Sequence, residues 1–157
     1  MRKNLSLVFL FLISCCGYST SSLLPSYLKT IYISQIENKT LQPLLAERLF
    51  DELVSGFTQS GRLRVSPDAS ADLVLKIEIT AYKKTASVFD ASRNVLKWNY
   101  SINYTADCKD MIKNSNLWGG GYSVNKDYEA GLDEQEALNR LLKLVREDII
   151  RNTLIAW

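Results

Sequence analysis

Two segments in which apolar and polar residues alternate, over residues 73–82 and 96–106, constrain the fold more than any other feature. Successive side chains of an extended strand point to opposite faces, so a period of two gathers the apolar residues on one face. In the second segment these residues are Leu96, Trp98, Tyr100, Ile102, Tyr104 and Ala106. Cys108 continues the same face and is expected to be a buried free thiol. We therefore predict two long strands in a sheet that is covered on one side only.

Shorter segments rich in β-branched and aromatic residues predict further strands at 29–36 and 63–65. Residues 117–124 predict a last strand, interrupted by the run Gly119-Gly120-Gly121. Polar residues at 37–40 and 90–94 predict connecting turns.

Two segments have the spacing of amphipathic helices. In the first, over residues 41–57, the apolar residues recur at steps of four: Leu41, Leu45, Leu49, Leu53 and Phe57. Thr40 is expected to cap it, and Leu44, Phe50 and Val54 are expected to widen its buried stripe. The second begins after Asp133, with Glu136 three residues on. Its stripe is Leu138, Leu141, Leu142, Val145, Ile149 and Leu154. The order predicts an α+β fold, with two helices packed on one face of a mostly antiparallel or mixed sheet of about four strands.

The N-terminus has the pattern of a secretory signal. Arg2 and Lys3 precede the apolar residues 5–13, a run of nine that is too short to span a bilayer, which takes ~20. Leu12-Ile13-Ser14-Cys15 then resembles the lipobox of bacterial lipoproteins, in which the cysteine receives a diacylglycerol and its new amine an acyl chain such as palmitate. We predict a signal peptide and lipobox at 1–15, a tether at 16–27 and one domain at 28–157.

The adjacent Cys16 leaves the lipidation site open between two residues. The spacing favours Cys15, because a cysteine directly before the cleavage site is unusual. A different alternative is a soluble secreted protein in which Cys15 or Cys16 forms a disulfide with Cys108.

Composition argues against nucleic-acid binding and against several classes of enzyme. Removing Arg2 and Lys3 from the 19 basic residues leaves 17, which equals the 17 acidic residues, so the mature chain lacks a basic footprint. The chain has no histidine, the commonest general base and a favoured zinc ligand. The adjacent carboxylates at 51–52 and 147–148 lie on the polar faces of the predicted helices. Asp107, Cys108 and Asp110 lack the spacing of a metal motif. We expect no catalytic residues, no metal and no cofactor.

Several motifs, in their order, resemble one family. They are Cys16-Gly17-Tyr18-Ser19, Leu24-Pro25, Thr30-Ile31-Tyr32-Ile33, Ile36-Glu37-Asn38-Lys39-Thr40, the helix from Leu44 to Phe57 followed by Gly61-Arg62-Leu63, Ala71-Asp72-Leu73-Val74-Leu75 and Thr85-Ala86-Ser87-Val88-Phe89. Together they resemble the lipopolysaccharide-assembly lipoprotein family LptE over nearly the whole mature chain. Two features depart from the family pattern. Ile77 stands where a glycine is common, and the family places its lipidated cysteine directly before the Gly-aromatic pair, which favours Cys16.

The resemblance implies a non-enzymatic lipoprotein, lipid-anchored at the Gram-negative outer membrane, at its periplasmic face and inside the lumen of the β-barrel LptD. It would serve that barrel as plug and assembly factor and could bind lipopolysaccharide. A contact with this ligand needs cations beside an apolar patch. Lys83 and Lys84, with Arg93 across a loop, are the densest such place. The alternative for the lysines is a solvated strand end whose charges keep an edge from pairing. The alternative function is a free-standing periplasmic lipoprotein that binds a peptide or small ligand. An exported hydrolase is disfavoured by the missing histidine.

Overall fold

The two alternating segments form the centre of the sheet in the computed structural model, which describes residues 24–155. They are the strands β4 (Leu73–Phe89) and β5 (Val95–Asp110), which pair antiparallel along their whole length. A third long strand, β6 (Ser115–Glu129), pairs antiparallel with β5. The prediction of two long strands with one apolar face is confirmed, because the side chains of Tyr100, Ile102 and Tyr104 on β5 are at most 2% exposed.

Three short strands complete a six-stranded sheet of the order β3-β1-β4-β5-β6, with β2 beside β4. They are β1 (Thr30–Ile33), β2 (Glu37–Asn38) and β3 (Arg64–Ser66), and all of their pairings are parallel. The sheet is therefore mixed, as predicted, but it has six strands rather than about four. Part of the excess is β2, which lies where the polar composition predicts a turn.

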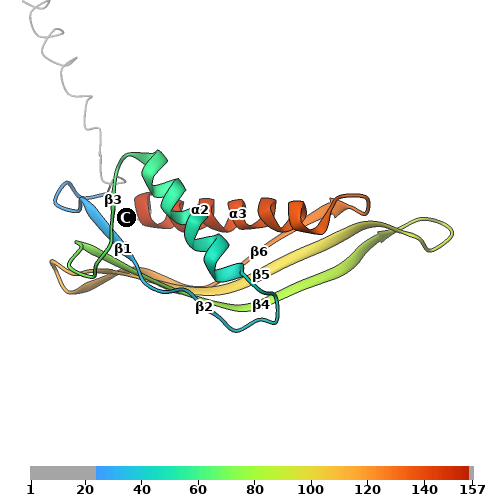
Figure 1. Cartoon of the computed structure of the whole chain (residues 1–157), viewed down its shortest axis with the longest axis horizontal. Helices are drawn as coiled ribbons and strands as arrows, with labels where there is room; N and C mark the ends of the chain where they lie inside the picture. The colour runs from blue at the N-terminus through green and yellow to red at the C-terminus, as the bar shows by residue number, and fades with distance from the viewer. Residues whose placement is uncertain (1–23, 156–157) are drawn as a thin grey trace, which may run out of the picture.

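Two helices, α2 (Leu45–Ser60) and α3 (Glu134–Ile155), cover one face of the sheet (Figure 1). The core lies between them and the strands, and it includes Leu49 and Leu53 from α2 and Leu138 and Leu141 from α3, all 0% exposed. This confirms the predicted α+β architecture, with both helices on the same side. No helix within residues 24–155 is long and apolar enough to cross a membrane.

The start of α2 differs from the prediction. The helix begins at Leu45 rather than at residue 41, because Leu44 adopts the left-handed conformation with a φ of 61°. The Thr40 hydroxyl accepts a hydrogen bond from the Gln42 amide within the preceding turn, and it makes no bond to the helix. Leu41, predicted to open the buried stripe, is fully exposed, and Leu44 is 53% exposed.

The start of α3 agrees with the prediction. The Asp133 carboxylate accepts hydrogen bonds from the backbone amides of Gln135 and Glu136, at 2.9 and 3.1 Å. These bonds satisfy two of the amides that have no partner within the first turn of a helix. All six residues of the predicted apolar stripe of α3 are buried.

The outer side of β6 forms one edge of the sheet, and no strand of the described chain pairs with it. Gly120 lies in this strand with a φ of 151°, a conformation open to glycine and rarely to other residues. A Cβ atom at the neighbouring Gly119 would lie 2.2 Å from the Asp107 carboxylate. All three glycines pair with β5 without a shift in register. The glycine run therefore lies within a continuous edge strand of 15 residues and does not interrupt it.

Candidate functional site

The face of the sheet opposite the helices is a polar surface, which we call the polar face. Its central positions alternate with the buried residues of β5 and β6 and carry hydroxyl and amide side chains: Asn99, Ser101, Asn103, Thr105, Ser123 and Asn125. The Asn99 amide donates to the Asp127 carboxylate at 2.7 Å, and the Ser123 hydroxyl donates to the Asn103 side-chain oxygen at 2.8 Å. Neither helix lies on this side (Figure 1).

Two ion pairs join charged side chains of the polar face. Lys97 and Glu129 are cross-strand neighbours with a nitrogen–oxygen distance of 3.0 Å, and Lys39 reaches Glu78 at 2.8 Å. Such exposed pairs contribute little to stability. They make the surface hydrophilic and pair charges of opposite sign on it.

The structure separates the two lysines predicted to contact lipopolysaccharide. Lys83 pairs with Ser101 in the sheet register and lies on the polar face. Lys84 pairs with the buried Tyr100 and lies on the helix side. Its ammonium forms an ion pair with Glu134 at 2.6 Å and lies 5.0 Å from the centre of the Trp98 ring. The hydrogen bond to Glu134 raises the pKa of Lys84, so this lysine stays protonated, and its charge is compensated by the Glu134 carboxylate.

Arg93 lies in the turn between β4 and β5, with a φ of 64°. Asp90 holds this turn by accepting hydrogen bonds from the amides of Ser92 and Asn94, both at 2.8 Å. The hairpin extends beyond the helices at one end of the molecule (Figure 1). Three large apolar side chains on it are 38 to 54% exposed: Val88, Phe89 and Leu96.

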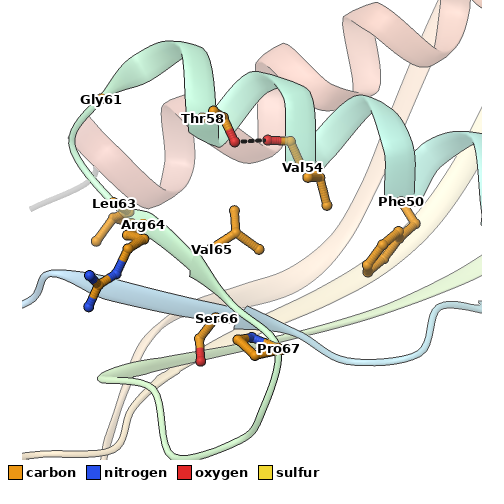
Figure 2. A pocket seen from close by; sticks show the side chains of 9 residues that line it. All are labelled: Phe50, Val54, Thr58, Gly61, Leu63, Arg64, Val65, Ser66 and Pro67. Atoms are coloured by element: carbon orange, nitrogen blue, oxygen red, sulfur yellow. Dashed lines mark hydrogen bonds between the residues drawn. The ribbon is translucent and has the colours of Figure 1, made fainter.

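An apolar groove of about 620 Å³ lies between α2 and β3. Phe50 and Val54 point from the helix toward Val65 on the strand (Figure 2). Thr58 is the polar side chain that α2 contributes to the groove, and its hydroxyl donates to the Val54 carbonyl at 2.7 Å. Sequence reasoning placed Phe50 and Val54 in the core, but Phe50 is 38% exposed and Val54 is half-buried. Each of the two residues lies one position after a residue of the main stripe, and this offset was the signal in the sequence that they lie at its edge.

Several polar side chains that could do chemistry are used in structural contacts. The Tyr104 hydroxyl donates to the Asp148 carboxylate at 2.6 Å, and burial raises the pKa of this tyrosine. Glu52 pairs with Arg146 at 2.8 Å between the two helices. Within residues 24–155 no three acidic or thiol side chains are grouped to hold a metal ion.

Cys108 is a buried free thiol, as predicted, with 0% exposure. Burial raises its pKa to about 12, so the thiol stays protonated and is a poor nucleophile at neutral pH. Cys15 and Cys16, the predicted lipidation sites, lie outside the described residues. Of the predicted tether, the described part packs on the core through Leu24 and Tyr27.

Residues 28–153 match the model of the lipopolysaccharide-assembly family LptE. The match takes in all of the helices and strands described above except the last residues of α3. None of the curated proteins matches the chain in sequence.

Solved structures with the same fold include several lipoproteins. An uncharacterized lipoprotein B from Nitrosomonas europaea has a TM-score of 0.55 at 17% identity, covering 83% of each chain. PelC from Paraburkholderia phytofirmans, a dodecamer, has a TM-score of 0.55 at 13% identity, covering 87% of this chain and 96% of PelC. Lipoprotein GNA1162 from Neisseria meningitidis has a TM-score of 0.50 at 15% identity, covering 78% of this chain and 99% of GNA1162. At these identities the likeness concerns the fold alone.

Proposed function

Since the chain belongs to the LptE lipopolysaccharide-assembly family, we propose that it is a non-enzymatic lipoprotein of the Gram-negative outer membrane that acts as plug and assembly factor of the LptD β-barrel. The observation that carries this proposal is the polar face of the sheet. It is hydrophilic and carries charges of both signs, and neither helix covers it. The lumen of a large barrel is lined by polar side chains, so a plug needs a surface of this kind.

The proposal predicts that apolar substitutions on the polar face weaken the complex with the barrel. Ser101 and Asn125 are direct cross-strand neighbours at its centre. We expect Ser101→Leu/Asn125→Leu to reduce several-fold the LptD recovered with the tagged full chain from detergent-solubilised outer membrane. The reason is that the leucines leave polar groups of the lumen without hydrogen-bond partners.

Lys143→Leu is the matched control, because this residue is exposed on α3, away from the polar face. It should recover as much LptD as the wild type. Equal recovery with all three proteins would remove the polar face from the contact. Failure of the wild type to recover any barrel would contradict the plug role itself.

We also propose that Cys15, or alternatively Cys16, carries the lipid anchor. Several acyl chains hold a protein on a membrane, since each buried CH₂ contributes about 0.8 kcal/mol. Mass spectrometry of the mature N-terminal peptide should find a diacylglycerol and an amide-linked chain on a single N-terminal cysteine. A peptide with two unmodified thiols would contradict the anchor.

A contact with lipopolysaccharide through Lys83, Lys84 and Arg93 is a further part of the proposal. Lys83 is exposed, whereas Lys84 is held by Glu134. Lys83→Ala/Arg93→Ala should therefore weaken binding of the full chain to purified lipopolysaccharide more than Lys84→Ala does. The effect should shrink as salt rises, because screening at ~0.15 M acts over about 8 Å. Unchanged affinity and salt response in both variants would show that these cations do not bind the phosphates.

The apolar groove between α2 and β3 favours the second candidate, a free-standing periplasmic lipoprotein that binds a peptide or small apolar ligand. The two functions separate in the recovery experiment. A free-standing lipoprotein would be isolated without the barrel, and its ligand binding would be sensitive to Val65→Asp in the groove.

A further inference from the structure

Three segments meet at the end of the molecule where the described chain begins (Figure 1). They are residues 24–28, the loop between β3 and β4, and the turn between β5 and β6. The Met111 amide of that turn donates to the Asp72 carbonyl of the loop at 2.8 Å. The hydroxyl of Tyr27, the last residue of the predicted tether, donates to the Asp110 carboxylate at 2.7 Å. The β5–β6 turn is thus tied to the point from which the N-terminal residues depart.

The Asp110 carboxylate fixes the conformation of this turn. It is 1% exposed, and besides Tyr27 it accepts hydrogen bonds from the amides of Ile112 and Lys113, both at 2.9 Å. The following residue, Asn114, has a φ of 50°, a left-handed conformation that asparagine tolerates. A turn held by three hydrogen bonds to one buried carboxylate is a rigid platform.

What this platform displays is a pair of apolar side chains between two cations. Met111 is 45% exposed and Ile112 is 57% exposed at the tip. Lys109 precedes them and Lys113 follows them, with the Lys113 ammonium 4.7 Å from the centre of the Tyr27 ring. The C-terminal end of α3 lies at the same end of the molecule, and there Ile155 is 56% exposed.

We propose that the β5–β6 turn docks on the surface of the membrane that holds the N-terminal lipid. Met111 and Ile112 enter the interface between headgroups and acyl chains, while Lys109 and Lys113 contact the phosphates of anionic phospholipids. This inference rests on the lipid anchor proposed above. It adds a second contact, through which the anchored domain takes a fixed orientation to the bilayer.

Chain length permits this contact. Nine residue steps separate Leu24 from Cys15, and an extended chain covers at most about 3.6 Å per residue, or about 32 Å. Single exposed apolar residues are ordinary on protein surfaces, but here two neighbours share a rigid tip with flanking lysines. The exposed apolar residues of the β4–β5 hairpin lie at the opposite end of the molecule (Figure 1). Asp68, in the β3–β4 loop, and Asp107, near the end of β5, are exposed carboxylates toward the docking end.

The test measures the depth of a fluorescent label on the full mature lipoprotein in vesicles of phosphatidylethanolamine and phosphatidylglycerol. The label is placed by Met111→Cys at the tip, by Ala69→Cys in the β3–β4 loop at the same end, or by Ala91→Cys in the distant β4–β5 turn. Protein without an introduced cysteine gives the background from native thiols. Nitroxide-labelled phospholipids quench labels that enter the bilayer.

We expect the label at 111 to be quenched several-fold more than the labels at 69 and 91. Ile112→Asp, and separately Lys109→Gln/Lys113→Gln, should return it to the level found at 69, with unchanged circular dichroism. Equal quenching at 111 and 69 on protein that floats with the vesicles would overturn the docking proposal and leave the anchor in place. Protein that does not float would overturn the anchor and, with it, the docking.

Discussion

Replacing Leu49 or Leu141 by alanine is expected to lower the free energy of unfolding by about 2–5 kcal/mol, as buried leucine truncations do in other proteins. Both side chains are 0% exposed, one in each helix, and both lie in the core between the helices and the sheet. Truncation removes buried apolar surface and leaves a cavity that well-packed neighbours fill only in part. Denaturant unfolding of the chain without residues 1–16 measures the loss.

Leu41→Ala is the matched control for this prediction. The residue belongs to the same sequence pattern as Leu49, at a multiple of four residues, but it is fully exposed because the helix begins at Leu45. Its substitution should change the free energy of unfolding by less than about 0.5 kcal/mol. A loss of that small size for Leu49→Ala would contradict the packing of α2, and a large loss for Leu41→Ala would contradict its exposure.

Asp110→Ala is expected to lower the free energy of unfolding by about 3 kcal/mol, because hydrogen bonds to charged groups contribute roughly 1.5–3 kcal/mol each. The substitution leaves the Tyr27 hydroxyl and two backbone amides without their common acceptor. Asp107→Ala, on the opposite face of the same strand, is exposed and should change stability little. Asp110→Asn retains a side-chain oxygen and should fall between the two. A loss for Asp110→Ala no larger than that for Asp107→Ala would show that the carboxylate does not hold the turn.

The stability that the Asp110 carboxylate contributes should depend on pH, and the direction of this dependence follows from its pKa. Burial alone would raise the pKa of Asp110, but hydrogen bonds from Lys113, Tyr27 and Ile112 lower it below its ordinary value of 3.8. In acid this carboxylate therefore binds a proton more readily in the unfolded chain than in the folded chain. The stability of the fold decreases as the pH decreases. The advantage of the wild type over Asp110→Asn should be full at neutral pH and shrink as the pH falls below 3.8. An advantage that stays constant through this range would contradict the charged hydrogen bonds.

The sequence predicts the long strands and the buried stripes of the helices because both depend on local periodicity. The alternation from Leu96 to Ala106 and the stripe of α3 required no knowledge of distant residues. The start of α2 depends on the backbone conformation of Leu44, which a leucine rarely adopts and the hydrophobic pattern does not report. Strand β2 is formed by pairing with Glu78 and Ile79, some 41 residues further along the chain.

The contacts of the candidate site were less predictable, because they join residues that lie far apart in the sequence. Alternation alone assigns Lys83 and Lys84 to opposite faces, but the partner of Lys84, Glu134, is 50 residues away in sequence. The bond between Tyr27 and Asp110 joins residues 83 positions apart. In the sequence, Asp110 is noted only with Asp107 and Cys108, because the spacing of these three residues fits no metal-binding motif. Its role in the turn emerges once the strands have brought both residues together.

The free edge of β6 makes this protein prone to self-association until the edge is covered. Fifteen residues of strand expose backbone donors and acceptors on one side, without a proline and with Lys126 as the one lysine along them. Such an edge can add a strand from any neighbouring chain, and sequences usually prevent this with charges, prolines or a covering segment. At high protein concentration, a copy whose β6 edge is uncovered can therefore associate with other copies. We therefore expect that covering this edge early, by a chaperone or by a binding partner, reduces the share of the protein that is lost to self-association.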